Sequence, residues 1–138
     1  RRVEMVPHYL DNSKIIDIRT KLMIEFEFWY LPAEEMELSV SIALNTVMGE
    51  CIFDVDSVAQ PYRKGLISGQ CVIPGDFLNN GSYSITLVFV KNTSSAVFEF
   101  EDCLSFDVDD FRENTSWYGD WPGAVRPKFK VELSHEKI

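Results

Sequence analysis

Aromatic side chains outside the predicted core are the residues of this chain best suited to binding a ligand. Trp29 and Glu27 fall on the polar side of the alternating run 22–30, and Trp117 and Tyr118 fall in a segment rich in Gly and Pro. Aromatic rings offer flat surfaces on which the C–H faces of sugars stack, and carboxylates accept hydrogen bonds from sugar hydroxyls. These four residues are therefore our candidates for binding a carbohydrate. The alternative is that the rings close an end or an edge of the fold, where Trp is common.

The Gly- and Pro-rich segment itself, 117–127, is the most unusual stretch of the sequence. It holds two of the three tryptophans and two of the six prolines, which argues against a helix or a central strand there. From composition alone it is either a loop that exposes aromatic surface or a crossing that links two packed elements.

The chain lacks the motifs of common catalytic sites. No G-x-x-x-x-G-K-[ST], G-x-S-x-G or H-E-x-x-H pattern occurs, and His8 and His135 lie near opposite ends of the sequence. Cys51, Cys71 and Cys103 form no C-x-x-C pair and sit in apolar runs, which predicts buried, reduced thiols. We therefore expect no catalytic residues and no cofactor. A glycosidase is a weaker alternative, because two carboxylates about 5–10 Å apart would suffice for it.

Acidic residues cluster at 54–56, 99–102 and 107–110. Carboxylates bind hard cations such as calcium, but none of these clusters has the D-x-D-x-D-G spacing of a calcium loop. Acids at alternate positions of a strand simply project to the same solvated face. We expect a solvated acidic face and no metal site.

The charge and hydropathy of the chain restrict the kinds of partner it can bind. The 138 residues include 13 basic and 22 acidic side chains, for a formal net charge of −9, which disfavours nucleic acid and anionic membranes. No apolar run approaches the roughly 20 residues of a membrane helix, and no signal peptide is evident. With reduced cysteines, these features predict a cytoplasmic protein without direct membrane insertion.

The elements that must position these side chains are strands, because the apolar residues recur with a period of two. The clearest runs are 22–30, 37–45, 83–90, 98–101 and 104–108, and weaker ones are 14–18, 49–55, 66–73 and 128–133. Only 33–36 and 110–114 could form a helical turn. About eight to nine short strands without long helices predict a single all-β domain, an antiparallel β-sandwich of immunoglobulin-like or jelly-roll type.

The order of several segments resembles the C-terminal domain of the ATP-binding subunits of polysaccharide ABC transporters, the Wzt type that exports O antigen. The resemblance spans residues 15–133 and is carried by the runs 22–30, 38–42, 69–74, 78–87 and 104–108, followed by the segment 117–127. It implies a non-catalytic carbohydrate-binding domain with an immunoglobulin-like fold, which recognises the terminal structure of a lipid-linked polysaccharide.

The resemblance also implies partners. The full-length protein would carry an ATPase domain upstream, associate with a membrane subunit of the transporter, and work at the cytoplasmic face of the inner membrane. Family members dimerise by exchanging the C-terminal strand, here 128–133, so Trp121 and Arg126 would shape its entry, and Phe129 and Val131 would contact the partner. The alternative function is a structural or protein-interaction domain, with the aromatic residues as core or dimer contacts.

Overall fold

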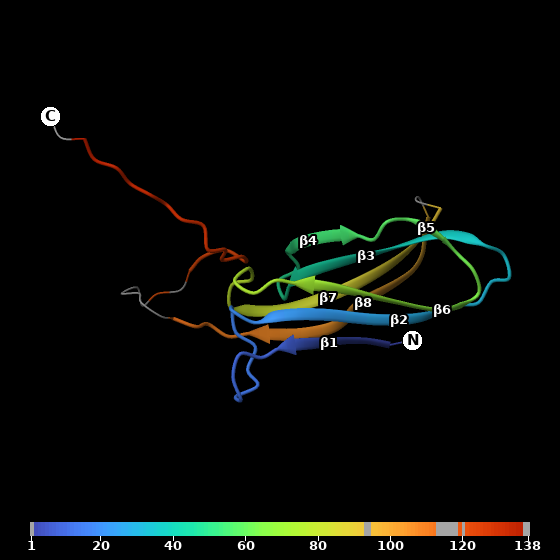
Figure 1. The fold of residues 1–138 in the computed structure, drawn as a ribbon, viewed down its shortest axis with the longest axis horizontal. Coiled ribbons are helices and arrows are strands. Elements are labelled where there is room, and N and C mark those ends of the chain that lie inside the picture. Colours follow the sequence, from blue (N-terminus) through green and yellow to red (C-terminus); the bar gives the residue numbers. More distant parts are fainter. Residues whose placement is uncertain (1, 93–94, 113–118, 120, 137–138) are drawn as a thin grey trace.

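The computed structural model describes residues 2–92, 95–112, 119 and 121–136, and these residues form eight strands and no helix (Figure 1). The strands are β1 (Arg2–His8), β2 (Lys21–Tyr30), β3 (Met36–Thr46), β4 (Cys51–Asp56), β5 (Gln60–Tyr62), β6 (Gly65–Ile73), β7 (Gly81–Lys91) and β8 (Ser95–Val108).

Two antiparallel sheets make up the domain. The smaller has the order β1-β2-β6, and the larger has the order β4-β3-β7-β8, with β5 paired to the first residues of β3. The sheets lie face to face, so the predicted antiparallel β-sandwich is confirmed (Figure 1).

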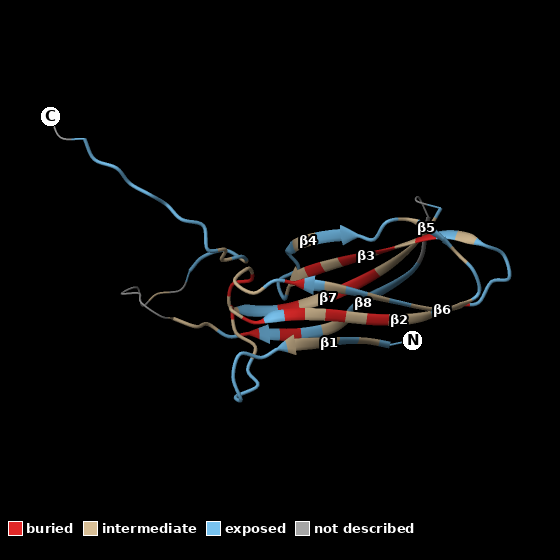
Figure 2. Ribbon diagram, viewed as in Figure 1, coloured by how far each residue is buried: buried red, intermediate tan, exposed pale blue. Residues whose placement is uncertain are grey.

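Alternate residues of the central strands build the core between the sheets (Figure 2). Leu22 and Ile24 of β2 face Leu44 of β3 and Ile85 and Leu87 of β7, and each is at most 2% exposed. Burying a side chain of this size stabilises the fold by about 1.5–3 kcal/mol. The period of two therefore sets both which residues form the core and which remain on the outer faces.

Several strand predictions were wrong or incomplete, and the short strand β5 was not predicted at all. β1 went unpredicted because Pro7 interrupts its short pattern, although an edge strand tolerates proline. The runs predicted as separate strands at 98–101 and 104–108 belong to one strand, β8. Residues 14–18 form no strand: Lys14 has a positive φ of 57°, and only a bridge between Asp17 and Asp109 remains.

The other corrections concern turns and cysteines. Residues 33–36 form a bend leading into β3 instead of a helical turn, and the second predicted turn, 110–114, extends beyond the described residues. All three cysteines are free thiols as expected, but Cys51 is exposed and the other two are only half-buried. Burial raises the pKa of Cys71 and also that of Cys103, so both thiols favour the protonated form.

Candidate functional site

The outer face of the larger sheet is hollowed into a depression of ≈ 660 Å³ over β3, β4, β7 and β8. Strand alternation places the hydroxyl side chains of β7 beside the acidic side chains of β8 on this face. We call it the polar depression, and its outward-facing lining includes Asn45, Asp54, Ser82, Ser84, Thr86, Val88, Glu99, Glu101, Asp102, Ser105 and Asp107.

Hydroxyl–carboxylate pairs cross between β7 and β8 within the polar depression. The Ser82 hydroxyl donates to Asp107 Oδ1 at 2.6 Å, and the Ser84 hydroxyl donates to Asp102 Oδ1 at 2.8 Å. Each hydroxyl that donates its proton in this way keeps its lone pairs available, and each carboxylate has further acceptor capacity. The pairs therefore hold an array of hydrogen-bond acceptors that suits a ligand rich in donors.

A bulge in β8 shapes the middle of the polar depression. The register shifts between Ile85 and Leu87, so that Thr86 alone on β7 faces residues 101–103 of β8. Asp102 adopts a left-handed conformation, with φ of 45°, and its backbone N–H donates to Thr86 Oγ1 at 3.1 Å. Asp tolerates this conformation better than most residues. Bulges re-aim the side chains of a strand, and this one places consecutive acidic residues at the depression.

The polar depression is strongly acidic. Five carboxylates line it, from Asp54, Glu99, Glu101, Asp102 and Asp107, and no Lys, Arg or His is found among its described lining residues. Throughout the described part of the chain, no three His, Cys, Asp or Glu side chains are grouped closely enough to hold a metal ion. The arrangement therefore favours neutral or cationic ligands over phosphates and uronates.

The two predicted sugar-binding residues that the structure describes, Trp29 and Glu27, lie elsewhere. Trp29 and Glu27 are on the outer face of the smaller sheet, so the structure does not bring them to the polar depression. Trp29 is 49% exposed, whereas Glu27 takes part in an ion pair with Arg2 at 3.3 Å. Trp117 and Tyr118 lie outside the described residues, so their assignment stays a prediction.

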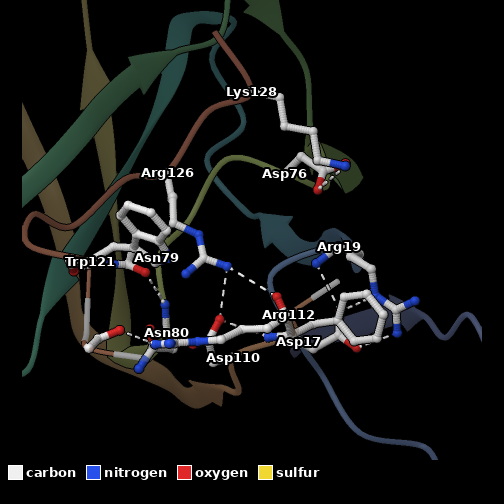
Figure 3. A network of polar contacts seen from close by, with 12 residues as sticks. Asp17, Arg19, Asp76, Asn79, Asn80, Asp110, Arg112, Trp121, Arg126 and Lys128 are labelled. Carbon is white, nitrogen blue, oxygen red and sulfur yellow. Dashed lines mark hydrogen bonds and ion pairs between the residues drawn. The ribbon is translucent and has the colours of Figure 1, made fainter. Parts of the chain in front are cut away.

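The segment that follows residue 120 is a crossing clamped to one end of the sandwich (Figure 3). The buried Asn79 amide donates to the carbonyl oxygens of Trp121, at 2.6 Å, and Gly123, at 2.8 Å. The Tyr83 hydroxyl lies 3.0 Å from the carbonyl oxygen of Ala124. Gly123 has φ of 94°, a conformation that glycine adopts without strain. Residues 121–126 therefore pack against the end of the sandwich, as a crossing would, but the described residues after them form no second packed element.

Arg126 fixes the end of this crossing (Figure 3). Its Nη2 donates to Asp110 Oδ1 at 2.8 Å, and its guanidinium lies 5.8 Å from the ring centroid of Trp121. Burial raises the pKa of Asp110, but hydrogen bonds from Arg112 and Arg126 outweigh this effect, and the pKa is lowered overall. The ionised carboxylate therefore stabilises the attachment of the C-terminal segment.

Lys128 still forms an ion pair with Asp76 of the sandwich at 3.2 Å, and beyond Lys128 the chain leaves as an extended segment (Figure 1). The strand predicted at 128–133 does not form in the single chain, because no neighbouring strand pairs with it. Phe129, Val131 and Leu133 alternate along it and are 85%, 90% and 95% exposed. These are almost fully exposed apolar side chains in a segment that has the pattern of a strand.

Comparison with known proteins supports the fold. No protein-family model and no curated protein sequence matches the chain. The solved structure of the C-terminal domain of wzt superposes with a TM-score of 0.67 over 96% of this chain and 81% of that one, at 12% identity. The X-ray structure of a structural-genomics target, SoR45, covers 88% of this chain and 95% of its own at 13% identity, with a TM-score of 0.31. The first likeness establishes a shared β-sandwich fold.

Within the described ranges there is no helix with the length and apolarity needed to span a bilayer.

Proposed function

We propose that this chain is a non-catalytic carbohydrate-binding domain that recognises the terminal structure of a lipid-linked, O-antigen-type polysaccharide. In the full-length protein it would follow an ATPase domain and act with the membrane subunit of an ABC transporter, at the cytoplasmic face of the inner membrane. The observation that carries the proposal is the polar depression, and the fold likeness to the C-terminal domain of wzt supports it.

The polar depression meets the chemical needs of a sugar. Sugar hydroxyls act as donors to the serine and carboxylate oxygens, while the small apolar side chains of Ala43 and Val88 leave room for a ring to approach the sheet. The carboxylates repel phosphate and carboxylate groups, so the recognised terminus is neutral or carries an amine. Trp29 lies on the other sheet and is a separate, secondary candidate for stacking.

Calorimetric titration with the polysaccharide of the organism that encodes the chain tests this proposal. Ser84→Val removes a hydroxyl from the polar depression, and we expect the affinity to fall about fivefold, the equivalent of about 1 kcal/mol for one hydrogen bond. Ser68→Val is the matched control, because Ser68 is exposed on the outer face of the smaller sheet. The proposal fails if wild type shows no binding at millimolar sugar, and recovery of a shortened glycan would indicate an enzyme instead.

The exposed C-terminal segment supports a second role, in dimerisation. We infer that residues 128–133 pair with a free strand edge of a second copy and bury Phe129, Val131 and Leu133. Three such side chains exposed at 85–95% are costly in water, and burying each would contribute about 1.5–3 kcal/mol. This role is compatible with the glycan-binding role and does not depend on it.

The edge that best accepts this segment is that of β6. The strands of the two sheets stack in matching order. β1 contacts β8, and Phe28 of β2 packs on Phe89 of β7, so β6 lies over β3. The smaller sheet therefore has no strand opposite β4, and no described strand covers the inward side of β4. Val55 on that side is 44% exposed. An added strand beside β6 would cover it.

Sedimentation of wild type and variants tests the dimer. Val131→Asp places a charge in the predicted contact, so we expect wild type to sediment as a dimer and this variant as a monomer. Val58→Asp introduces the same charge at a residue that is 76% exposed in the loop after β4, and should remain dimeric. A monomeric wild type, or equal behaviour of both variants, would contradict strand exchange.

A further inference from the structure

A second cavity opens between the two sheets at the end of the sandwich opposite the C-terminal crossing. This cleft has a volume of ≈ 450 Å³ and is lined by the end of β2, the loop after it, and parts of β1, β3, β7 and β8. Its lining is almost entirely apolar and includes seven aromatic residues, Phe26, Phe28, Trp29, Tyr30, Phe89, Phe98 and Phe100. We call it the aromatic cleft.

The rings of the aromatic cleft form a continuous series from the core to the surface. Phe26 is 7% exposed and its ring centroid lies 6.4 Å from that of Phe28, which lies 4.6 Å from that of Phe89. The series continues to Phe98 at 6.0 Å and then to Phe100 at 6.2 Å. Because Phe98 and Phe100 are 57% and 44% exposed, the outer part of this apolar surface faces water.

Cationic groups stand at the edge of the aromatic cleft. Lys91 and Arg2 are part of its lining, and Glu27 is the only acidic residue among the described residues that line it. Arg2 forms ion pairs with Glu4 at 2.8 Å and with Glu27 at 3.3 Å, whereas Lys91 has no ion-pair partner among the described residues. Lys91 is therefore the cation of this lining that the described acidic side chains leave unpaired, in a chain with a net charge of −9.

We propose that the aromatic cleft binds the apolar chain of an anionic amphiphile, with the anionic head group beside Lys91. Clefts of about 300–1,000 Å³ with apolar and aromatic linings and a few polar groups are typical of small-molecule sites. The ligand must be apolar along its length because the lining offers few hydrogen-bond partners, and its head must be anionic because Lys91 is unpaired. This site lies away from the polar depression and does not depend on glycan binding there, although its lining includes Trp29 and Glu27, which the sequence suggested for sugar binding.

The C-terminal segment of a second copy fits this cleft less well. Phe129 and Val131 could enter it, but Lys128 and Lys130 would then approach the cations at its edge. A glycan alone is also disfavoured, since sugar hydroxyls would find few acceptors there.

Titration with a chain-length series provides the test. Octanoate, decanoate and dodecanoate, each below its micelle-forming concentration, are added to a Trp117→Phe/Trp121→Phe variant while the fluorescence of its single tryptophan, Trp29, is followed, with near-UV circular dichroism as a check on the fold. Each buried methylene should tighten binding about fourfold, so that two methylenes give about tenfold or more. Dodecyltrimethylammonium, which has the same chain and the opposite charge, should bind at least severalfold more weakly than dodecanoate.

Two variants and one control locate the ligand. Lys91→Gln should lower the affinity for dodecanoate about three- to fivefold and leave the affinity for dodecanol unchanged, as expected for the loss of one partly exposed ion pair. Phe98→Ser should lower the affinity for both dodecanoate and dodecanol, because Phe98 is part of the apolar lining. Lys21→Gln removes a charge at the far end of β2 and should bind like wild type.

Several results would overturn the proposal. These are no saturable binding by the folded protein, equal affinity for the cationic and anionic amphiphiles, or an unchanged dodecanoate affinity in Lys91→Gln. Binding that appears only when a dimer is diluted to monomers would assign the cleft to a second copy instead.

Discussion

The clamp on the C-terminal crossing should contribute a measurable share of the stability of the domain. Asn79 is 3% exposed, and its amide makes two hydrogen bonds to the carbonyl oxygens of Trp121 and Gly123. Its Oδ1 also accepts from the backbone N–H of Asn80 at 3.0 Å. The substitution Asn79→Ala removes all three bonds and leaves their backbone partners to find water.

The expected loss of stability in Asn79→Ala follows from these contacts. Each hydrogen bond contributes about 0.5–1.5 kcal/mol net, and the exposed position of the crossing allows partial rehydration. We therefore expect the free energy of unfolding to fall by about 2–3 kcal/mol, a large part of the 5–15 kcal/mol of a typical domain. With a urea m-value of about 1–3 kcal/mol/M, the midpoint should shift by about 1–2 M.

Urea unfolding followed by circular dichroism is the assay, and Asn80→Ala is the matched control. Asn80 carries the same amide in the next position, and only its backbone takes part in the clamp. The control should stay within about 0.5 kcal/mol of wild type. If Asn79→Ala behaves like Asn80→Ala, the crossing is not held by this side chain and our interpretation of the segment is wrong.

Three further predictions concern the same end of the sandwich. Tyr83→Phe removes a buried hydroxyl that lies 2.6 Å from the Asn79 carbonyl oxygen, and thermal unfolding should show a loss of about 1 kcal/mol. Gly75→Ala should lower the free energy of unfolding by about 3 kcal/mol or more in the same measurement, because the added Cβ would lie 2.1 Å from the backbone oxygen of Arg19. A loss below about 1 kcal/mol would contradict this packing. Burial raises the pKa of Asp110, but its arginine partners lower it below the ordinary value overall. The ionised carboxylate therefore stabilises the folded domain fully above about pH 4, and this contribution is lost as the pH falls through the pKa of the folded state. Asp110→Asn should therefore lose less stability than wild type between about pH 6 and pH 3, as measured by urea unfolding.

The sandwich could be predicted because its central strands have one polar and one apolar face. In β2 and β7 the alternation is regular enough to place the strand and its buried side. β1 could not be predicted in this way because proline and a short pattern conceal it at a sheet edge. The segment 128–133 has the same alternation as a strand, yet pattern alone does not supply the neighbour that a strand needs.

The polar depression was harder to predict than the fold. Its acids and hydroxyls are visible as alternating residues, and the sequence indicates a solvated acidic face. What the sequence lacks is the register that sets Ser82 opposite Asp107, and the bulge that brings Asp102 to Ser84. Both are set by pairing between β7 and β8. Trp29, in contrast, drew attention because of its residue type, although its position on the smaller sheet separates it from those groups.

The central claim is that the polar depression on the larger sheet binds a glycan terminus, and NMR titration of the isotope-labelled chain tests it most directly. Adding the polysaccharide should shift the backbone amide signals of residues 82–88 and 99–107, and leave those of β6 unchanged. Shifts confined to Trp29 and its neighbours on β2 and β6 would contradict the claim and assign glycan binding to the smaller sheet.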